Sequence, residues 1–223
     1  HPTQNKIMFR STRQLESGIE TQRIFTIAPD GGFPMPLKLI EAARGSFSAD
    51  GQKIAFNKTS RSGRTWKRYE GGRAQEVYLY NLETDEEKQL TDFEGTDRFP
   101  MWIGDKIYFT SDRDGHLNLY SVDENGENLT QLTSHDTYDA RFPDAGKEKI
   151  VYEHGGDIFA YDLQSGETGK IDISISTDAV SARPRIVKVD ENITGIGVSP
   201  SGERALVEAR GEIFTVPQKH GPL

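Results

Sequence analysis

Short apolar strands alternate with polar turns along the whole chain. The clearest strands begin with Lys or Arg and carry apolar residues at alternate positions: KIMFRS, KIAFNK, KIYFTS, KIVYEH and, more weakly, RALVEA, starting at residues 6, 53, 106, 149 and 204. A second apolar strand follows each of them, such as EVYLYN at 76–81 and LNLYSV at 117–122. Alternation with period two and many Val, Ile, Tyr and Phe residues indicate strands. Helical periodicity is nearly absent, so the pattern predicts an all-β chain.

The strands recur as one repeated unit. A third strand follows in four repeats, as PLKLI at 36–40, KQLTDF at 88–93, TQLTSH at 130–135 and GKIDIS at 169–174. A further strand and turn precede the later repeats, as in RFPMWIGD and GSFSADGQ. The repeats are 47, 53, 43 and 55 residues apart, and four strands per ~40–50 residues are typical of β-propeller blades. A two-sheet sandwich could use the same strands, but it would not require this repeat.

The fold class predicted is therefore an all-β propeller built of four-stranded antiparallel blades. It is incomplete in this chain, with about four blades and the start of a further one. The unequal spacing locates an insertion at 59–75, inside one blade, and a Ser-, Pro- and charge-rich segment near 175–195. We expect a partial first propeller over 1–174, a linker over 175–195 and the first strands of a second propeller over 196–223. Because His1 is no initiator Met, we expect the missing blades to lie upstream.

Composition narrows the classes of partner. The 223 residues carry a formal net charge of −8 and no cysteine. Acidity argues against a nucleic-acid partner, and no run approaches the ~20 apolar residues that span a bilayer. The lack of cysteine excludes disulfides and thiolate metal sites, and fits the cytoplasm and the periplasm equally.

No motif for catalysis is present. The nucleophile elbow G-x-S-x-G does not occur, and the five histidines have no metal-binding spacing. We therefore expect no catalytic residue, metal site or cofactor in this chain.

The insertion is the one basic and aromatic segment in this acidic chain. It holds Trp66, Lys67, Arg68, Tyr69 and Arg73. The rings and cations could form cation–π stacks or bind anionic or carboxylate groups. Alternatively the rings close the edge of the blade while the cations stay solvated. We predict that Trp66 and Tyr69 pack against a neighbouring blade or domain, and that Arg68 or Arg73 pairs with an acid.

Two further candidate contacts repeat at the junctions between blades. Arg98 and Arg141 each precede a Phe-Pro dipeptide. They could pair with carboxylates near the central channel or tie one blade to the next. The second interpretation is favoured, because a buried Arg usually needs a partner.

The blade sequences resemble the PD40/TolB-type propeller repeat, as in SFSADGQKIAF and GGDIFAYDLQSGE. The element Trp-Lys-x-Tyr-x-Gly-Gly at 66–72, followed by EVYLYNLET, is more specific. It resembles the N-terminal propeller of the tricorn protease family. ARGEIFTVP at 209–217 resembles the opening of that family's second propeller.

This resemblance implies a large cytoplasmic serine peptidase that trims oligopeptides as a homo-hexamer. Its propellers are expected to act as scaffold and size-selecting channels, with the catalytic residues in a C-terminal core that has no matching position here. The alternative is a TolB-like propeller that binds a protein partner and has no peptidase attached. Both interpretations predict protein contacts, no membrane contact and no cofactor.

Overall fold

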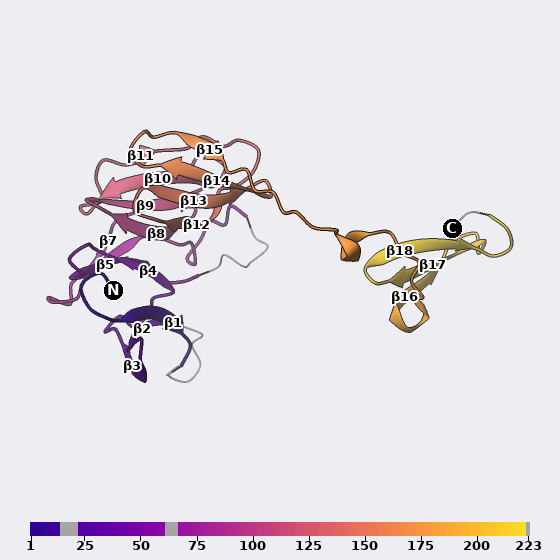
Figure 1. Cartoon of the computed structure of the whole chain (residues 1–223), viewed down its shortest axis with the longest axis horizontal. Helices are drawn as coiled ribbons and strands as arrows, with labels where there is room; N and C mark the ends of the chain where they lie inside the picture. The colour runs from indigo at the N-terminus through magenta and orange to yellow at the C-terminus, as the bar shows by residue number, and fades with distance from the viewer. Residues whose placement is uncertain (14–21, 61–66, 222–223) are drawn as a thin grey trace. The chain divides into compact units, whose positions relative to one another are not determined.

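The computed structural model describes residues 1–13, 22–60 and 67–221. In this part of the chain the strands form five antiparallel sheets, each made of strands consecutive in sequence (Figure 1). The chain divides into two compact units, His1–Ile173 and Ser174–Leu223. Among the described residues no helix has the length and apolar character needed to cross a membrane.

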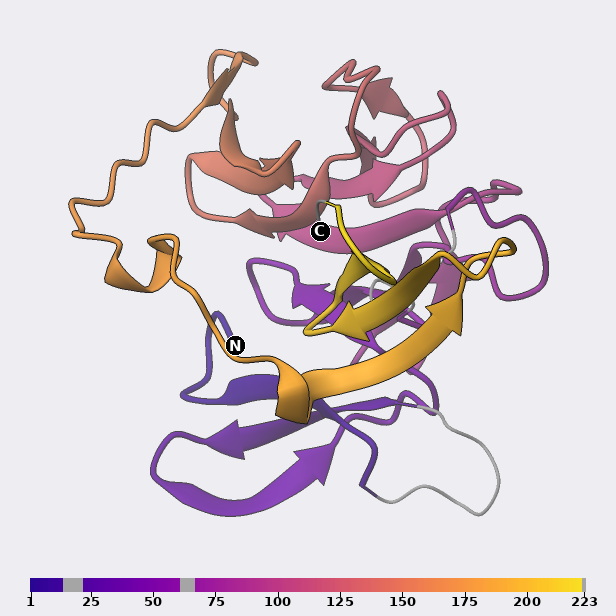
Figure 2. The same ribbon diagram turned by 90° about the vertical axis from the view of Figure 1, so that its right-hand side faces the viewer.

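The first unit holds four sheets that follow one another in space as they do in sequence (Figure 2). The three-stranded sheet contains β1 (Ile7–Ser11), β2 (Arg23–Ala28) and β3 (Gly31–Pro36). The next contains β4 (Arg44–Phe47), β5 (Lys53–Asn57), β6 (Tyr78–Asn81) and β7 (Glu87–Gln89). The third contains β8 (Asp97–Ile103), β9 (Lys106–Ser111), β10 (Asn118–Asp123) and β11 (Thr130–Gln131). The fourth contains β12 (Arg141–Ala145), β13 (Lys149–His154), β14 (Asp157–Asp162) and β15 (Thr168–Lys170).

Apolar side chains join each sheet to the next. Ile24 of the first sheet and Leu39, which follows that sheet, pack with Ile54 and Phe56 of the second. Comparable clusters lie between the second and third sheets, around Phe109, and between the third and fourth sheets. The second and third sheets each have a neighbour on both faces, so the cores lie between blades, which is the arrangement of a propeller. The predicted all-β fold of antiparallel blades is confirmed.

The first strands of the blades lie together. Strand β8 contacts both β4 and β12, and in each of these sheets the second, third and fourth strands follow in order on one side of the first. In this arrangement β4, β8 and β12 are the strands nearest the axis of the propeller. Loops that lead into these strands therefore meet the loops between second and third strands at one end of the unit.

The outer strands were predicted too long or out of place. The first lies at 31–36 and not at 36–40, because Gly31 and Gly32 adopt positive φ and close the hairpin directly after β2. Strands β7 and β11 end at Gln89 and Gln131. The side chains of the next residues, Leu90 and Leu132, lie in the cores between blades. Strand β15 spans 168–170 and therefore overlaps the strand expected at 169–174 only at residues 169 and 170.

The second unit is a small sheet of three strands. It contains the short 3-10 helices η1 (Val180–Ala182) and η2 (Asp190–Asn192), followed by β16 (Ile193–Val198), β17 (Arg204–Ala209) and β18 (Glu212–Pro217). Most of its described side chains are exposed, and Ala209 is buried. The assignment of residues 196–223 to a second propeller stays a prediction.

Candidate functional site: a basic pocket between blades

The insertion lies between β5 and β6, as the repeat spacing predicted. Two residues of its described part adopt left-handed backbone, Arg68 with φ 51° and Gly71 with φ 143°. The ring of Tyr69 folds over Gly71, where an added Cβ would lie 3.0 Å from the tyrosine hydroxyl. The positive φ favours glycine at position 71, and an added Cβ would also have to displace the Tyr69 hydroxyl slightly. This explains why a Tyr and a Gly stand two residues apart in the loop.

The loop is tied to a distant blade by a buried carboxylate. Lys67 Nζ lies 2.9 Å from Asp139 Oδ2, and Arg68 Nη2 lies 3.5 Å from Asp139 Oδ1. Arg68 Nε also donates a hydrogen bond to the carbonyl of Gly115. The side chain of Asp139 is only 6% exposed and accepts a further hydrogen bond of 3.1 Å from the Leu117 N–H. The expected pairing of Arg68 with an acid is confirmed.

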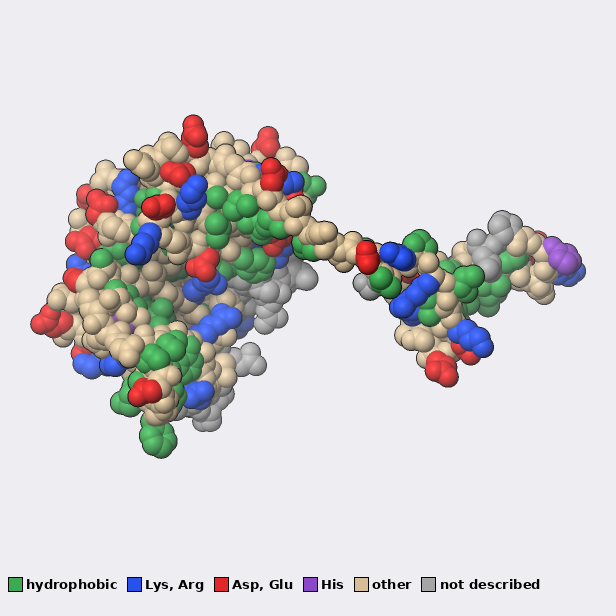
Figure 3. Space-filling view, in the orientation of Figure 1, with side chains coloured by type: hydrophobic (Ala, Val, Ile, Leu, Met, Phe, Trp, Pro, Cys, Tyr) green, Lys and Arg blue, Asp and Glu red, His purple; other side chains and the backbone are tan. Residues whose placement is uncertain are grey.

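A pocket opens where the insertion meets the third and fourth blades. The residues that line it are Lys67, Arg68, Tyr69, Arg73, Gln75, Thr96, Arg98, Asp112, Leu117 and Asp139. Four of them are cations and two are carboxylates, so the lining carries a formal charge of +2 in a chain of −8. Figure 3 shows that acidic side chains dominate the upper and left edges of the first unit. The pocket is thus a local exception to the charge of the molecule.

Arg98 lies half-buried in this pocket. Burial lowers the pKa of its guanidinium, while the carboxylates of Asp139 and Asp112 raise it. Its carbon Cζ lies 5.3 Å from the centre of the Phe99 ring, and its Nε is buried without a hydrogen-bond partner. Among the described residues no carboxylate pairs with Arg98 or with the exposed Arg73. These two cations are therefore available to a ligand.

Arg98 also belongs to a series of equivalent positions. Register pairs Arg44 with Asn57, Arg98 with Thr110 and Arg141 with Glu153. Each partner is the fourth residue after the lysine that opens its repeat. In the second, third and fourth blades an arginine therefore stands at the same place on the first strand.

The surroundings of these arginines differ. Arg44 lies 4.3 Å from the centre of the Phe99 ring, and Arg141 lies 4.8 Å from the centre of the Phe142 ring. Arg141 is exposed and forms an ion pair of 3.6 Å with Glu153 of its own blade. It does not line the pocket that holds Arg98.

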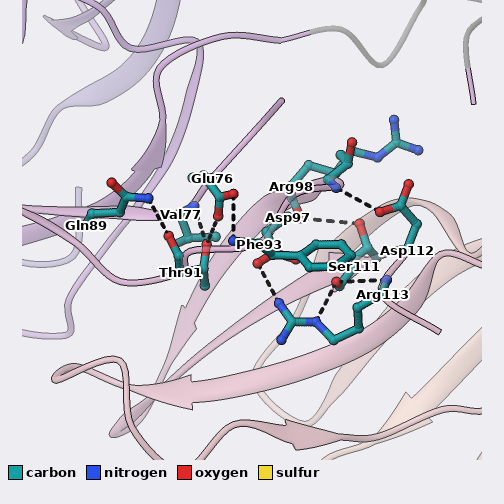
Figure 4. A network of polar contacts seen from close by, with 12 residues as sticks. Glu76, Val77, Gln89, Thr91, Phe93, Asp97, Arg98, Ser111, Asp112 and Arg113 are labelled. Atoms are coloured by element: carbon teal, nitrogen blue, oxygen red, sulfur yellow. Dashed lines mark hydrogen bonds and ion pairs between the residues drawn. The ribbon is translucent and has the colours of Figure 1, made fainter. Parts of the chain in front are cut away.

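Two carboxyl groups, the buried Asp97 and the half-buried Glu76, hold the walls of the pocket in place (Figure 4). Asp97 accepts a hydrogen bond of 2.7 Å from Arg113 Nη2, and its backbone N–H donates to the Gln75 carbonyl at 2.6 Å. Glu76 accepts from Thr91 Oγ1 at 2.5 Å and from the Phe93 N–H at 3.0 Å. Burial raises the pKa of Glu76 to about 7, against the effect of these hydrogen bonds.

The structure brings most of the candidate binding residues together. Lys67, Arg68, Tyr69, Arg73 and Arg98 line one pocket, and Arg141 stands outside it. Trp66 lies outside the described residues. The interpretation of all seven as binding residues stays a prediction.

Sequence reasoning missed the remaining lining residues, above all Asp139 and Asp112. Asp139 stands two residues before Arg141 in the repeated junction, and this position was the available signal. Arg44 was missed as well, although aligning the repeats on their lysines would have placed it opposite Asn57.

Comparison with solved structures gives the class of fold, a β-propeller. TolB from Acinetobacter baumannii matches with a TM-score of 0.58 at 19% identity, over 97% of this chain and 52% of that one. A crystal structure of the tricorn protease matches with a TM-score of 0.54 at 19% identity, over 95% of this chain and 25% of that one. At such identities these likenesses show the fold.

Sequence comparison gives the family. The profile of the tricorn protease N-terminal beta propeller domain matches residues 1–167, and the chain belongs to this family. The tricorn protease homolog of Saccharolobus solfataricus is 31% identical over 157 residues, which are 70% of this chain and 14% of that protein. The tricorn protease of Thermoplasma acidophilum is 26% identical over 191 residues, 86% of this chain and 17% of that protein. The chain thus spans about a seventh of the length of such relatives.

Proposed function

We propose that this chain is the non-catalytic propeller portion of a tricorn-type serine peptidase that degrades oligopeptides. In this proposal the blades form a scaffold and a channel that admits unfolded peptides and excludes folded proteins. The observation that carries the proposal is the family match over residues 1–167. The chain is also similar in sequence to relatives described as tricorn proteases, and it covers a small part of their length.

The arrangement of the first strands supports a channel. Strands β4, β8 and β12 lie nearest the axis, and their outward neighbours are packed by apolar cores that leave little freedom between blades. Rigid walls of this kind select by size, because a folded domain cannot be accommodated by moving one blade. Equivalent arginines at Arg44, Arg98 and Arg141 would give the wall a repeated polar surface suited to peptide backbone and carboxylates.

The proposal includes partners and compartment. The other domains of the same peptidase and further subunits, six in all, would surround the propeller in the cytoplasm. Oligopeptides would be the substrates of the whole protein, and nucleic acid and membrane would have no part.

The experiment uses the natural full-length protein that contains this chain. Arg141→Cys would be labelled with a bulky maleimide on the strand nearest the axis, and Glu167→Cys on the outer turn before β15 provides the matched control. Hydrolysis is measured with peptides of increasing length and with a folded protein. We expect the label at position 141 to slow the hydrolysis of long peptides several-fold more than that of a minimal reporter substrate. The label at position 167 should slow the hydrolysis of neither.

Two results would contradict the proposal. Equal rates of long-peptide hydrolysis by the two labelled proteins would contradict the proposed channel. If the full-length protein hydrolyses no peptide, the proposed peptidase function is contradicted. That result would favour the alternative, a TolB-like propeller that binds a protein partner. The second candidate is kept because the TolB structure superposes on this chain at least as well as the tricorn protease structure does.

A further inference from the structure

The basic pocket has a charge that its own residues do not neutralise. Asp139 is fully engaged, because Lys67 at 2.9 Å, Arg68 at 3.5 Å and the Leu117 N–H at 3.1 Å all bind it. Asp112 Oδ1 accepts a hydrogen bond of 2.8 Å from the Thr96 N–H. Among the described residues, Arg73 and Arg98 stand without an ion pair in the same pocket.

The position of Arg98 is costly without a ligand. Its side chain is half-buried, its Nε has no acceptor among the described residues, and its Cζ lies 5.3 Å from the centre of the Phe99 ring. A guanidinium removed from water loses solvation that only hydrogen bonds from an acceptor can restore. Arg73 reaches the same pocket from the insertion, so two guanidinium groups approach it from different blades.

The chemistry of the lining selects among anions. A guanidinium binds a carboxylate through two parallel hydrogen bonds. Asp112 and Asp139 remain in the wall and hold the formal charge of the lining at +2. They would repel a phosphate dianion or a nucleic-acid backbone more strongly than a single carboxylate. Tyr69 and Leu117 add apolar surface that suits the rest of a peptide.

We propose that this pocket binds a carboxylate group of a peptide, with Arg73 and Arg98 as the residues that hold it. The inference rests on the proposed function, because a peptide must reach this end of the propeller. The carboxylate comes either from an acidic side chain or from the carboxyl terminus, and the shared chemistry is the same.

Binding is measured by fluorescence anisotropy on the natural full-length protein, inactivated with a serine-directed reagent. Three labelled hexapeptides serve as probes: one with a free carboxyl terminus and no acidic residue, one amidated with a central Glu, and one amidated without Glu. The variants are Arg73→Gln, Arg98→Gln and the double substitution. Lys106→Gln is the control, because it removes one exposed charge from the same blade outside the pocket.

We expect the double substitution to weaken binding of at least one carboxylate peptide by about ten- to a hundredfold, in line with hydrogen bonds between charged groups. The peptide that responds identifies the source of the carboxylate. The amidated peptide without Glu should bind all variants equally, and Lys106→Gln should bind all peptides as the native protein does. Since Arg73 is exposed, Arg73→Gln tests the site even if Arg98→Gln does not fold.

Unchanged affinity of both carboxylate peptides in the folded variants would overturn the inference, as would competition by single-stranded DNA as strong as that by acetate. These results are distinct from failure of the proposed function. If the protein hydrolyses no peptide but the variants lose carboxylate binding, the pocket inference stands and the proposed peptidase function is contradicted. If the protein hydrolyses peptides but the variants bind the carboxylate peptides with unchanged affinity, the peptidase function stands and the pocket inference is contradicted.

Discussion

Lys67 Nζ and Asp139 Oδ2 lie 2.9 Å apart, although one stands in the insertion of the second blade and the other directly before the fourth. The ion pair therefore reaches across the blade between them. Its two ends differ in exposure, since the Lys67 side chain is 66% exposed and that of Asp139 is 6% exposed. The buried carboxylate of Asp139 holds the insertion in place, and Lys67 and Arg68 balance its charge.

Replacement of this carboxylate should loosen the insertion. Asp139→Asn keeps the shape but removes the charge that binds Lys67 and Arg68. Because hydrogen bonds to charged groups contribute about 1.5–3 kcal/mol, we expect the free energy of unfolding to fall by about 1–3 kcal/mol. Urea denaturation measures it, with exposed Glu167→Gln as the control. Equal midpoints for Asp139→Asn and the control would contradict the expectation.

The same substitution should change the response to acid. Burial raises the pKa of Asp139, but hydrogen bonds from Lys67 and Leu117 outweigh it and lower the pKa below 3.8. The carboxylate therefore stabilises the fold above pH 3.8, and this contribution is lost as the pH falls through the lowered value. The difference in stability between native protein and Asp139→Asn should shrink in that window. A difference that stays constant down to pH 2 would contradict this assignment.

Glu76 should make the fold less stable as the pH rises toward neutrality. Burial raises its pKa from 4.5 to about 7, so the folded state prefers the protonated form. Stability from this group is complete below pH 4.5 and declines until about pH 7. In the Glu76→Gln variant the fall in the free energy of unfolding over this pH range should be smaller by up to about 3 kcal/mol. Urea midpoints between pH 4.5 and 8 test it, with exposed Glu94→Gln as a control that should retain the native profile.

Two adjacent glycines provide a matched test of the loop. Gly71 has φ 143° and lies against Tyr69, whereas an added Cβ at Gly72 meets nothing within 4 Å. Gly71→Ala should lower the free energy of unfolding by about 1–3 kcal/mol, because it combines backbone strain with a steric contact. Gly72→Ala should have little effect. Thermal unfolding of the two variants decides, and equal loss in both would show that the glycine at 71 is not required.

Two stacked histidines should make the fourth blade sensitive to mild acid. The ring centres of His135 and His154 are 3.8 Å apart, and His135 Nε2 lies 2.9 Å from the Tyr152 hydroxyl. Burial, then the charge of His154, lowers the pKa of His135 below 6.5. Stability is therefore present above pH 6.5 and lost as the pH falls through the lowered value. His154→Phe should reduce the loss between pH 7 and 5, and an unchanged profile would contradict the coupling.

Much of the fold follows from local chemistry. Alternating residues such as those of KIYFTS specify a strand with two faces, and turn dipeptides such as Asp50-Gly51 close hairpins, with Gly51 at φ 73°. The ends of the outer strands were less predictable. Leu90 reads as a strand residue in sequence, but strand β7 ends at Gln89 and the Leu90 side chain lies in the core between blades.

The sequence by itself determined the repeat, the antiparallel blades, the place of the insertion and the family, since each rests on residues close together in the chain. Tertiary structure alone decided that Asp139 binds Lys67 and Arg68, and that Arg98 shares their pocket while Arg141 stands outside it. The physical reason is that these contacts join different blades. Their geometry depends on how the blades pack around the axis, which no local pattern of residues specifies.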